Sequence, residues 1–436
     1  MLTSSQAIRF SSADFGKELF WEIFDLFALY FMVNALNLPP SLAGSILMAT
    51  LFADALADPI LGMIFDRMEK SRKMLFPLFV VCPIICSIFI LVFYSARGDF
   101  WGFSGVLILL VLIFRIFYSL VDIPINAVTA YIARSEGQKS RLWGLRKAGA
   151  TAAALLLSAF GTRLRDALGS DGGGAAFLLP VMLLCVVACG AYAISWGALP
   201  RAWRVEPMAR RGDVLAPVIA LLKNARFWGM ILLLFLNASI FGMLARATIF
   251  LAPEGTEGAG FPSYSSLLAA MVAGRVLSIA VVSMVSIERG RRVSLCLVLA
   301  TLWLSSLGLC IAAGEFFLLL LFAANGFSVG GIALVAWSYS PDMADEDSVA
   351  AQDAVATSLA LFSMAVKLGA GLGTALLAGL LSIHGAHSAD IFAQRTGFSL
   401  LQSILMVTLA GAATASLCAI CLPPFRRPRL RGVSGA

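Results

Sequence analysis

The sequence of 436 residues has few charged side chains. Only 13% of its residues are Asp, Glu, Lys or Arg, whereas soluble domains carry about 25%. Hydrophobic residues make up 60% of the chain, and the mean hydropathy is +0.91. This composition excludes a soluble globular domain. It predicts an all-α polytopic membrane protein, because a helix satisfies its own backbone hydrogen bonds in lipid.

Metal-binding side chains are also scarce. The chain has two histidines, His384 and His387, and both fall in one loop. All eight cysteines fall inside apolar stretches, where we interpret them as small packing residues. The pair Cys418 and Cys421 lacks a second pair of ligands, and no nucleophile motif is visible. We therefore expect no enzyme activity, no catalytic residue, no metal site and no cofactor.

Twelve apolar stretches are long enough to cross a bilayer as helices. The expected spans are 19–38, 41–65, 74–95, 102–133, 142–162, 174–197, 227–251, 262–286, 293–313, 316–340, 354–382 and 397–423. A basic, proline-containing segment divides them in the middle. We therefore expect a six-helix bundle over residues 1–199, a cytoplasmic linker over 200–226, and a second six-helix bundle with a basic tail over 227–436.

Basic residues fall on one side of these expected spans. The termini and the loops that follow even-numbered spans hold 22 Lys and Arg residues, and the opposite loops hold four. Because basic loops stay in the cytoplasm, we expect both termini to be cytoplasmic in a bacterial inner membrane. The net charge of +7 therefore reflects topology, and we expect a lipid bilayer but no nucleic acid as a partner.

Two carboxylates lie four residues apart within the second expected span. Asp54 and Asp58 are about one helical turn apart, so both point to the same face of the helix. An ionised Asp near the bilayer centre costs at least ~2.5 kcal/mol, and two like charges one turn apart cost more. The pair predicts a site for a proton or a cation. The alternative interpretation is a pair of acids that caps a helix end near the headgroups.

Further charges lie in expected spans outside any motif. Among them are Glu22, Asp25, Arg115, Arg246 and Arg275. Acids and bases in neighbouring spans can pair with one another. The alternative for Arg246 and Arg275 is that their side chains extend to a membrane interface.

A weak internal repeat relates the two halves of the chain. Asp66-Arg67 precedes a basic turn after the second span, and Glu288-Arg289 precedes another after the eighth. Repeated halves around a central site are typical of secondary transporters.

Several motifs follow one another in the order and spacing of a known family. They are Phe15-Gly16-Lys17-Glu18, Asp54-x-x-x-Asp58-Pro59-x-x-Gly62, Asp66-Arg67 with Arg72-Lys73, Asp122-Ile123-Pro124, Arg146, Asp342-x-x-Asp345 and Lys367. Together they resemble the glycoside–pentoside–hexuronide:cation symporters of the major facilitator superfamily. The resemblance implies a major facilitator fold with 12 transmembrane helices in two six-helix bundles. It also implies that a monomer transports a small-molecule solute.

The resemblance implies three groups of functional residues. Coupling to H+ or Na+ is assigned to Asp54, Asp58, Ser119 and Asp122. Substrate binding is assigned to Lys17, Glu18, Tyr118, Asp122, Asn126, Arg146 and Lys367. Cytoplasmic gating is assigned to Asp66, Arg67, Arg72, Asp342 and Asp345, with the last two in an expected acidic loop. The alternative for Glu18, Asp122 and Arg146 is a charge network that orients the helices.

Departures from the family pattern leave the ion and the cargo open. Ala57 stands where a typical sodium-using member has an asparagine, which favours a proton as the coupling ion. Asn126 and Ala333 stand where the best-known member has tryptophans that flank its sugar, and Trp337, one turn further, is a candidate replacement. We expect cation-coupled symport of a small polar solute, a sugar or glycoside. A proton-coupled antiporter or exporter, or a lipid-type transporter of the same fold, is the alternative.

Overall fold

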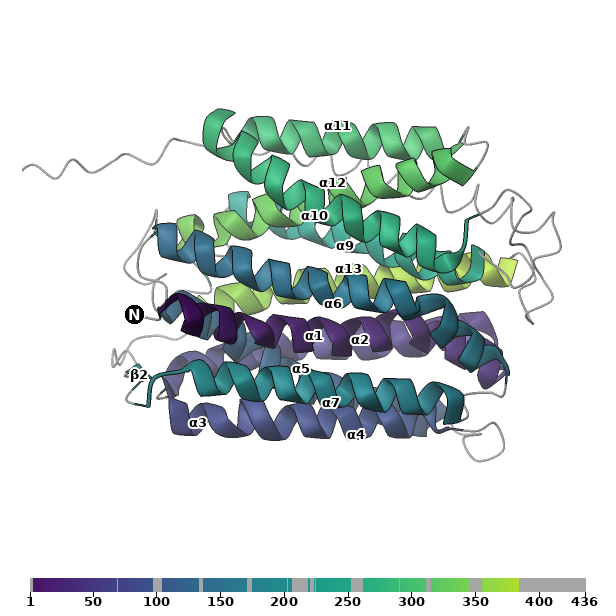
Figure 1. Ribbon diagram of the computed structural model, residues 1–436, viewed down its shortest axis with the longest axis horizontal. Coiled ribbons are helices and arrows are strands. Elements are labelled where there is room, and N and C mark those ends of the chain that lie inside the picture. The colour runs from purple at the N-terminus through teal and green to yellow at the C-terminus, as the bar shows by residue number, and fades with distance from the viewer. Residues whose placement is uncertain are drawn as a thin grey trace, which may run out of the picture.

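The structure is a computed structural model that describes residues 3–68, 70–96, 104–132, 136–170, 175–201, 203–205, 219, 223, 225–251, 262–289, 291–310, 315–345 and 355–383. Nearly all of these residues are helical. The helices lie side by side along the longest axis of the molecule (Figure 1). The expected twelfth span and the basic tail lie outside the described residues.

The first half of the chain comprises the elements up to α7. They are α1 Ser4–Tyr30 with the π-helical turn η1 Phe31–Ala35, α2 Pro40–Arg67, α3 Arg72–Phe76, η2 Pro77–Val81, α4 Cys82–Tyr94, α5 Ser104–Ile132, α6 Glu136–Ser170 and α7 Ala175–Ala198. Two short strands, β1 Lys70–Ser71 and β2 Arg204–Val205, pair antiparallel with Lys70 opposite Val205.

The second half comprises the elements from α9 onward. They are α9 Ala225–Leu251, α10 Tyr264–Arg289, α11 Arg291–Cys310, α12 Glu315–Asp345 and α13 Val355–Ile383. The halves meet chiefly where α13 packs on α2 and where α10 packs on α6. In Figure 1, α6 accordingly lies between α1 and α10.

Nine helices of the described part are long and apolar enough to cross a membrane. They correspond to expected spans two to four and six to eleven. The first and fifth expected spans form α1 and α6, which carry many charged residues and are not among these nine. Both helices nevertheless pack inside the bundle: α1 contacts α7 and α9, and α6 contacts α7 and α10.

Three helices are longer than the sequence predicts. α1 begins at Ser4 instead of residue 19, and Thr3 caps it by accepting a hydrogen bond from the Gln6 amide at 3.2 Å. α6 runs over 136–170 instead of 142–162. α12 continues to Asp345, so the expected acidic loop begins as helix. Hydropathy misplaced the start of α1 because its charges are paired inside the protein and do not mark a membrane surface.

Small residues let α2 and α13 approach closely along their length. A Cβ atom added to Gly44 would lie 2.2 Å from the Ala378 Cβ, and one added to Gly62 would lie 2.9 Å from the Ala360 Cβ. These two contacts lie near opposite ends of α2. Because helices in lipid associate through close van der Waals packing, this seam holds the two halves together.

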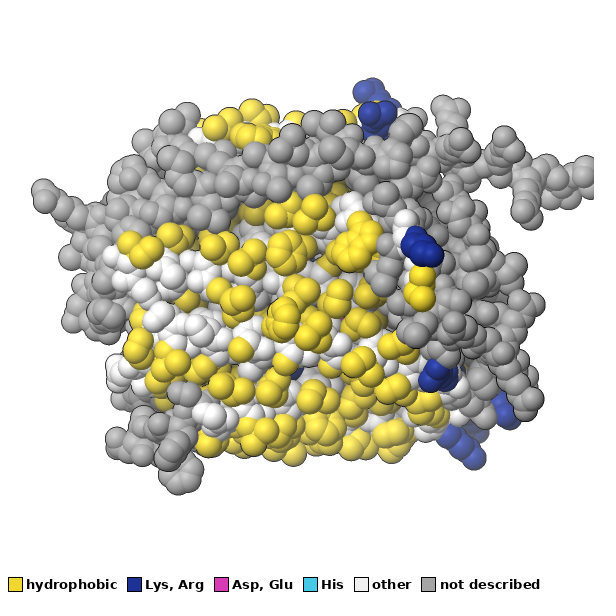
Figure 2. Space-filling model, turned by 180° about the vertical axis from the view of Figure 1, so that it is seen from behind, with side chains coloured by type: hydrophobic (Ala, Val, Ile, Leu, Met, Phe, Trp, Pro, Cys, Tyr) yellow, Lys and Arg dark blue, Asp and Glu magenta, His cyan; other side chains and the backbone are white. Residues whose placement is uncertain are grey.

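The outer surface is apolar and is bordered by basic residues. Leu56, Ile60 and Ile64 of α2 are each about half exposed. Figure 2 shows hydrophobic side chains spread over one face, with Lys and Arg gathered at one end. That end, which we call the basic end, is the one at which α1 begins (Figures 1 and 2). Such an apolar band is suited to contact with lipid.

Candidate functional site

The two carboxylates of α2 face a lysine of α13. The Lys367 Nζ atom lies 2.7 Å from Asp58 Oδ1 and 2.9 Å from Asp54 Oδ2. It also donates a hydrogen bond to Ser119 Oγ, and Ser119 in turn donates to Asp54 Oδ1 at 2.8 Å. Both carboxylates therefore lie on one helix face, as their spacing predicts. We call these four residues the coupling cluster.

The coupling cluster is closed off from solvent. All four side chains are buried, and Asp58 is 0% exposed. The Oδ2 atom of Asp58 has no hydrogen-bond donor among the described residues. Two carboxylates and one ammonium leave the cluster with a formal charge of −1. A buried charge of this kind is stabilised by a further positive charge or by a proton.

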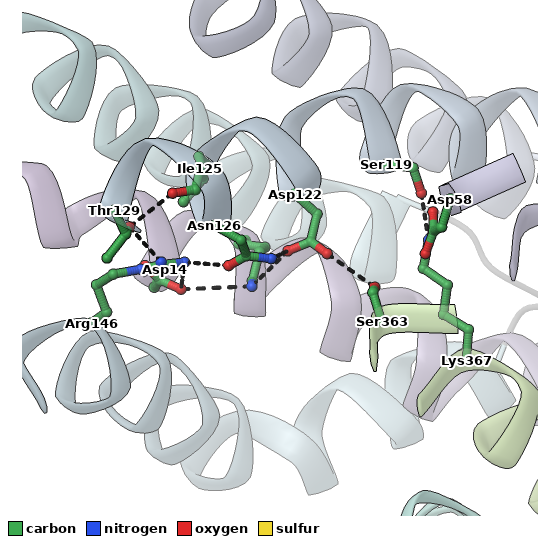
Figure 3. A network of polar contacts seen from close by, with 11 residues as sticks. Asp14, Asp58, Ser119, Asp122, Ile125, Asn126, Thr129, Arg146, Ser363 and Lys367 are labelled. Atoms are coloured by element: carbon green, nitrogen blue, oxygen red, sulfur yellow. Dashed lines mark hydrogen bonds and ion pairs between the residues drawn. The ribbon is translucent and has the colours of Figure 1, made fainter. Parts of the chain in front are cut away.

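Asp122 of α5 joins helices of both halves. Its Oδ1 atom accepts hydrogen bonds from Lys17 Nζ at 2.8 Å and from Asn126 Nδ2 at 3.1 Å. Its Oδ2 atom accepts one from Ser363 Oγ of α13 at 3.3 Å. Figure 3 shows this chain of contacts beside the coupling cluster. Asp122 therefore connects Lys17 of α1 with α13, the helix that carries Lys367.

Arg146 of α6 holds α1 and α5 together. Its guanidinium donates to both carboxylate oxygens of Asp14, with Nη2 to Oδ1 at 2.9 Å. It also donates to Asn126 Oδ1 at 2.7 Å and to Thr129 Oγ1 at 2.6 Å, and it stacks 4.5 Å from the Trp143 ring. Arg146 contacts neither Asp58 nor Asp122 directly. It reaches Asp122 through Asn126 (Figure 3).

Three acids of α1 beyond Asp14 face arginines of the second half. Arg275 of α10 lies 3.3 Å from Glu18 and 3.7 Å from Glu22. Arg246 of α9 forms an ion pair with Asp25 and also donates to the Asp25 carbonyl oxygen at 3.0 Å. The interpretation that these arginines extend to a membrane interface is therefore wrong.

Every ion pair between the two halves, within the described residues, joins a carboxylate of the first half to a base of the second half. The carboxylates of the first half are Glu18, Glu22, Asp25, Asp54 and Asp58. The bases of the second half are Arg246, Arg275 and Lys367.

Arg115 of α5 is buried without an ion pair in the described part of the chain, and it lies over the rings of Trp21 and Phe24.

A cavity of about 230 Å³ lies between the halves, next to these networks. Pockets for drug-sized ligands occupy ~300–1,000 Å³, so this one suits a small solute. All seven residues assigned to substrate binding line it: Lys17, Glu18, Tyr118, Asp122, Asn126, Arg146 and Lys367. Ala333 and Trp337 line it as well. Trp337 packs 6.1 Å from Trp143, ring centroid to ring centroid.

The structure adds cavity residues that the motifs do not contain. Asp14, Trp143, Lys147, Asn237 and Ser363 line the same cavity. Asp14 falls three residues before the Lys17-Glu18 pair, and this i, i+3 spacing is the one local signal that could have identified it. Asn237 and Ser363 carry no such signal, because long-range packing alone brings α9 and α13 to the cavity.

The assigned gating residues do not form one contact. Asp66 accepts hydrogen bonds from the Thr357 amide at 2.9 Å, the Ala356 amide at 3.0 Å and the Thr357 hydroxyl at 2.8 Å, at the start of α13. Tyr131 of α5 donates to it at 3.3 Å. Asp66 therefore joins the halves at the basic end, where a carboxylate is favoured at a helix N-terminus.

The other gating residues lie elsewhere. Arg67 is exposed and has no polar partner among the described residues. Arg72 stacks on Trp196 at 4.4 Å, within the first half. The side chains of Asp342 and Asp345 lie outside the described part of the chain. Lys70 of β1 is buried, and this burial lowers its pKa while the nearby Asp66 carboxylate raises it in part.

Comparison with known sequences gives one family over nearly the whole chain. The family model described as MFS/sugar transport protein matches residues 9–426. An uncharacterized symporter of Synechocystis is 25% identical over 152 residues, 32% of this chain and 27% of that protein. A putative sulfoquinovose importer of Salmonella typhimurium is 23% identical over 230 residues, 51% of this chain and 48% of that protein. The chain therefore spans less than half the length of these curated relatives.

Solved structures share the arrangement of helices. A mutant of the nucleoside transporter NupG has a TM-score of 0.66 at 15% identity, covering 96% of this chain and 100% of that chain. A bacterial homolog of the human lysosomal transporter Spinster has a TM-score of 0.62 at 14% identity, covering 96% of this chain and 95% of that one. These likenesses confirm the expected all-α membrane fold.

Proposed function

The chain belongs to the MFS/sugar transport protein family, and on that premise we propose that it couples transport of a small polar solute to movement of a cation. The solute is a sugar or glycoside, and the mechanism is alternating access, in which two helix bundles rock about a central site. The relatives named as a symporter and an importer support this direction of transport. No enzymatic step is part of the proposal.

The observation that carries the proposal is the position of Lys367. Its ammonium is itself a monovalent cation, tethered by the side chain and placed between Asp54 and Asp58. A transported cation that joined this cluster would neutralise the remaining negative charge and loosen the hold of the carboxylates on Lys367. Because Lys367 belongs to the second half and the carboxylates to the first, such a change alters the contact between the halves.

The coupling cluster adjoins the proposed solute site. Lys367 lines the cavity, and Ser363, one helical turn before it, donates to Asp122. We assign solute contacts to Lys17, Glu18, Tyr118, Asp122, Asn126 and Arg146. Asp122 also takes part in cation coupling, because Ser363 links it to the helix that carries Lys367. Carboxylates accept hydrogen bonds from adjacent hydroxyl groups, and Lys and Arg donate to them, so this lining is suited to a polyhydroxylated solute.

We assign the proton as the coupling ion. The coupling cluster offers the carboxylates of Asp54 and Asp58 and the hydroxyl of Ser119, while Ala57 contributes no side-chain oxygen. Hard metal cations require several oxygen ligands, whereas a proton requires one carboxylate. The substitution Ala57→Asn adds an oxygen and should increase the response of uptake to sodium. Uptake by the unsubstituted protein that requires sodium and ignores a proton gradient would show that the assignment is wrong.

The sequence supplies the remaining parts of the proposal. Residues 1–199 and 227–436 are the two bundles, and 200–226 is the linker. The basic end faces the cytoplasm of a bacterial cell with the chain in the inner membrane, because basic residues are retained on that side. The monomer is the transporting unit. The gating contact at that end is made by Asp66 and the start of α13.

The test is uptake into proteoliposomes with a proton or a sodium gradient. Panels of glycosides, pentosides and hexuronides should include a solute that accumulates only with a gradient. Asp58→Asn should abolish accumulation and retain exchange, and Glu315→Gln, an exposed carboxylate at the start of α12, serves as the matched control. Full accumulation by Asp58→Asn would refute the mechanism. Counterflow separates symport from antiport, since the solute and cation move together only in symport.

A further inference from the structure

The bases around the cavity are matched with acids except in one case. Arg146 pairs with Asp14, Lys17 with Asp122, Arg275 with Glu18 and Glu22, and Lys367 with Asp54 and Asp58. Lys147 of α6 also lines the cavity, but it forms no ion pair among the described residues, although Glu18 and Asp14 are near enough to act on its charge. It is the lining ammonium that a solute can reach without breaking an existing ion pair in the described part of the chain.

The surroundings of Lys147 only partly replace a counter-charge. Its Nζ atom lies 6.0 Å from the centroid of the Trp337 ring, at the outer limit of a cation–π contact. The side chain is partly buried between the halves. An ammonium held away from water in a membrane protein normally pairs with an anion or a carbonyl group, so this position favours an incoming negative charge.

Two other features of the same cavity are suited to a ligand. The Asn237 carboxamide donates from Nδ2 to the Val329 carbonyl oxygen at 3.3 Å, but its Oδ1 atom is buried without a donor. Asn237 is 7% exposed and lines the cavity. The Trp143 and Trp337 rings, from opposite halves, form an aromatic wall with an angle of 36° between their planes. A cation without an ion pair, an unpaired acceptor and an aromatic wall are together suited to a ring-shaped solute.

We propose that Lys147 binds a negatively charged group of the solute, with Trp143 and Trp337 against its ring and Asn237 Oδ1 accepting from one of its hydroxyl groups. This assignment rests on the proposed function and deepens it, because it makes the cargo an acidic solute. Arg146, the neighbouring base, does not take this role because its guanidinium already donates to Asp14, Asn126 and Thr129.

The experiment compares two solutes that differ in one charged group. Methyl glucuronide and methyl glucoside share a sugar ring, but only the glucuronide carries a carboxylate. Binding to the purified full-length protein is followed by tryptophan fluorescence, and uptake is measured in proteoliposomes. The glucuronide should be bound and transported in preference to the glucoside. Lys147→Gln should raise the KM and Kd of the glucuronide at least about tenfold, since a hydrogen bond to a charged group is worth ~1.5–3 kcal/mol and each ~1.4 kcal/mol is a tenfold change.

Controls separate a binding role from a structural one. Lys147→Arg keeps the charge and should retain the preference for the glucuronide. Lys73→Gln, an exposed lysine in α3, should leave both solutes unaffected. The glucoside KM should change less than about twofold in Lys147→Gln, because that solute makes no ionic contact with Lys147. Equal losses for both solutes, or a preference for the glucoside in the unsubstituted protein, would overturn the assignment of Lys147.

The proposed function fails by a different outcome. If gradient-driven uptake of the glucoside remains and Lys147→Gln has no selective effect, only the acidic-solute assignment is wrong. If the protein neither binds nor transports either sugar, or any member of the wider panel, the proposed function itself is refuted. The fluorescence measurement requires no gradient, so it tests the site even where coupling is lost.

Discussion

Lys367 of α13 donates to Asp58 of α2 at 2.7 Å, so the second half of the chain supplies the counter-charge for carboxylates of the first half. The same ammonium contacts Asp54 and Ser119. One side chain therefore links α2, α5 and α13. In a family of transporters, such a contact between halves is where ion binding and helix movement can be connected.

Removing the ammonium should destabilise the protein more than removing the whole ion pair. Lys367→Gln leaves Asp54 and Asp58 buried without their shared base, and breaking a buried pair in this way costs about 3 kcal/mol. The double variant Lys367→Gln with Asp58→Asn should recover part of that loss. Thermal unfolding in detergent measures both effects, with Lys73→Gln as the control. Equal stability of the single and double variants would contradict a direct pairing.

Lysine should not replace arginine at position 146. The planar guanidinium donates to Asp14, Asn126 and Thr129 at once, and a point charge cannot reproduce that geometry. Arg146→Lys should therefore weaken solute binding at least ~10-fold and lower the unfolding temperature. Tryptophan fluorescence and thermal scans measure these changes, and the exposed Arg67→Lys is the matched control. Normal binding by Arg146→Lys would show that the network only fills space.

Asp66 should contribute more to the contact between halves than its neighbour Arg67. Asp66→Ala removes the acceptor for the Ala356 and Thr357 amides, which should cost about 1–2 kcal/mol, the usual value of a lost helix cap. The rate of transport at saturating solute should change with it. Arg67→Ala, at an exposed position, should change neither quantity. Equal effects of the two substitutions would argue against a gating role for Asp66 alone.

A methyl group on Gly44 should separate α2 from α13. The added Cβ would lie 2.2 Å from the Ala378 Cβ, so Gly44→Ala should destabilise the protein by about 1–3 kcal/mol. Adding Ala378→Gly should restore much of the loss. Gly190→Ala in α7 has no heavy atom within 4 Å of its new Cβ and serves as the control. Thermal unfolding and yield after purification measure the difference. Failure of the second substitution to compensate would contradict direct contact at this seam.

Local patterns predicted the part of the site that is itself local. Asp54 and Asp58 lie one turn apart in an apolar stretch, which was enough to predict their shared face. The partner Lys367 is 309 residues away from Asp58, and only the family resemblance pointed to it. The resemblance assigned it to the solute; in the structure it lines the cavity, and its ammonium also contacts the carboxylates of α2.

Hydropathy failed where charges are neutralised inside the protein. Asp14 and Lys17 precede the first apolar run, so the expected span began at residue 19 and excluded both. In the structure they lie within α1 and pair with Arg146 and Asp122. The pairing depends on α5 and α6, which no local window of the sequence contains. Spans two to four and six to eleven depended on apolar length alone, and the structure has helices there.

In the ion pairs between the halves, the first half supplies the carboxylates and the second supplies the bases, and this has a consequence for how the protein assembles. Weakly repeated halves resemble a fused dimer of two similar subunits. Two copies of the first half brought face to face would oppose carboxylates with carboxylates, and two copies of the second would oppose bases with bases. Like-charge contacts of this kind penalise the wrong partner. The complementary charges thus favour pairing of a first half with a second half over pairing of two identical halves. A chain built by duplication could acquire this complementarity only after its two copies had diverged.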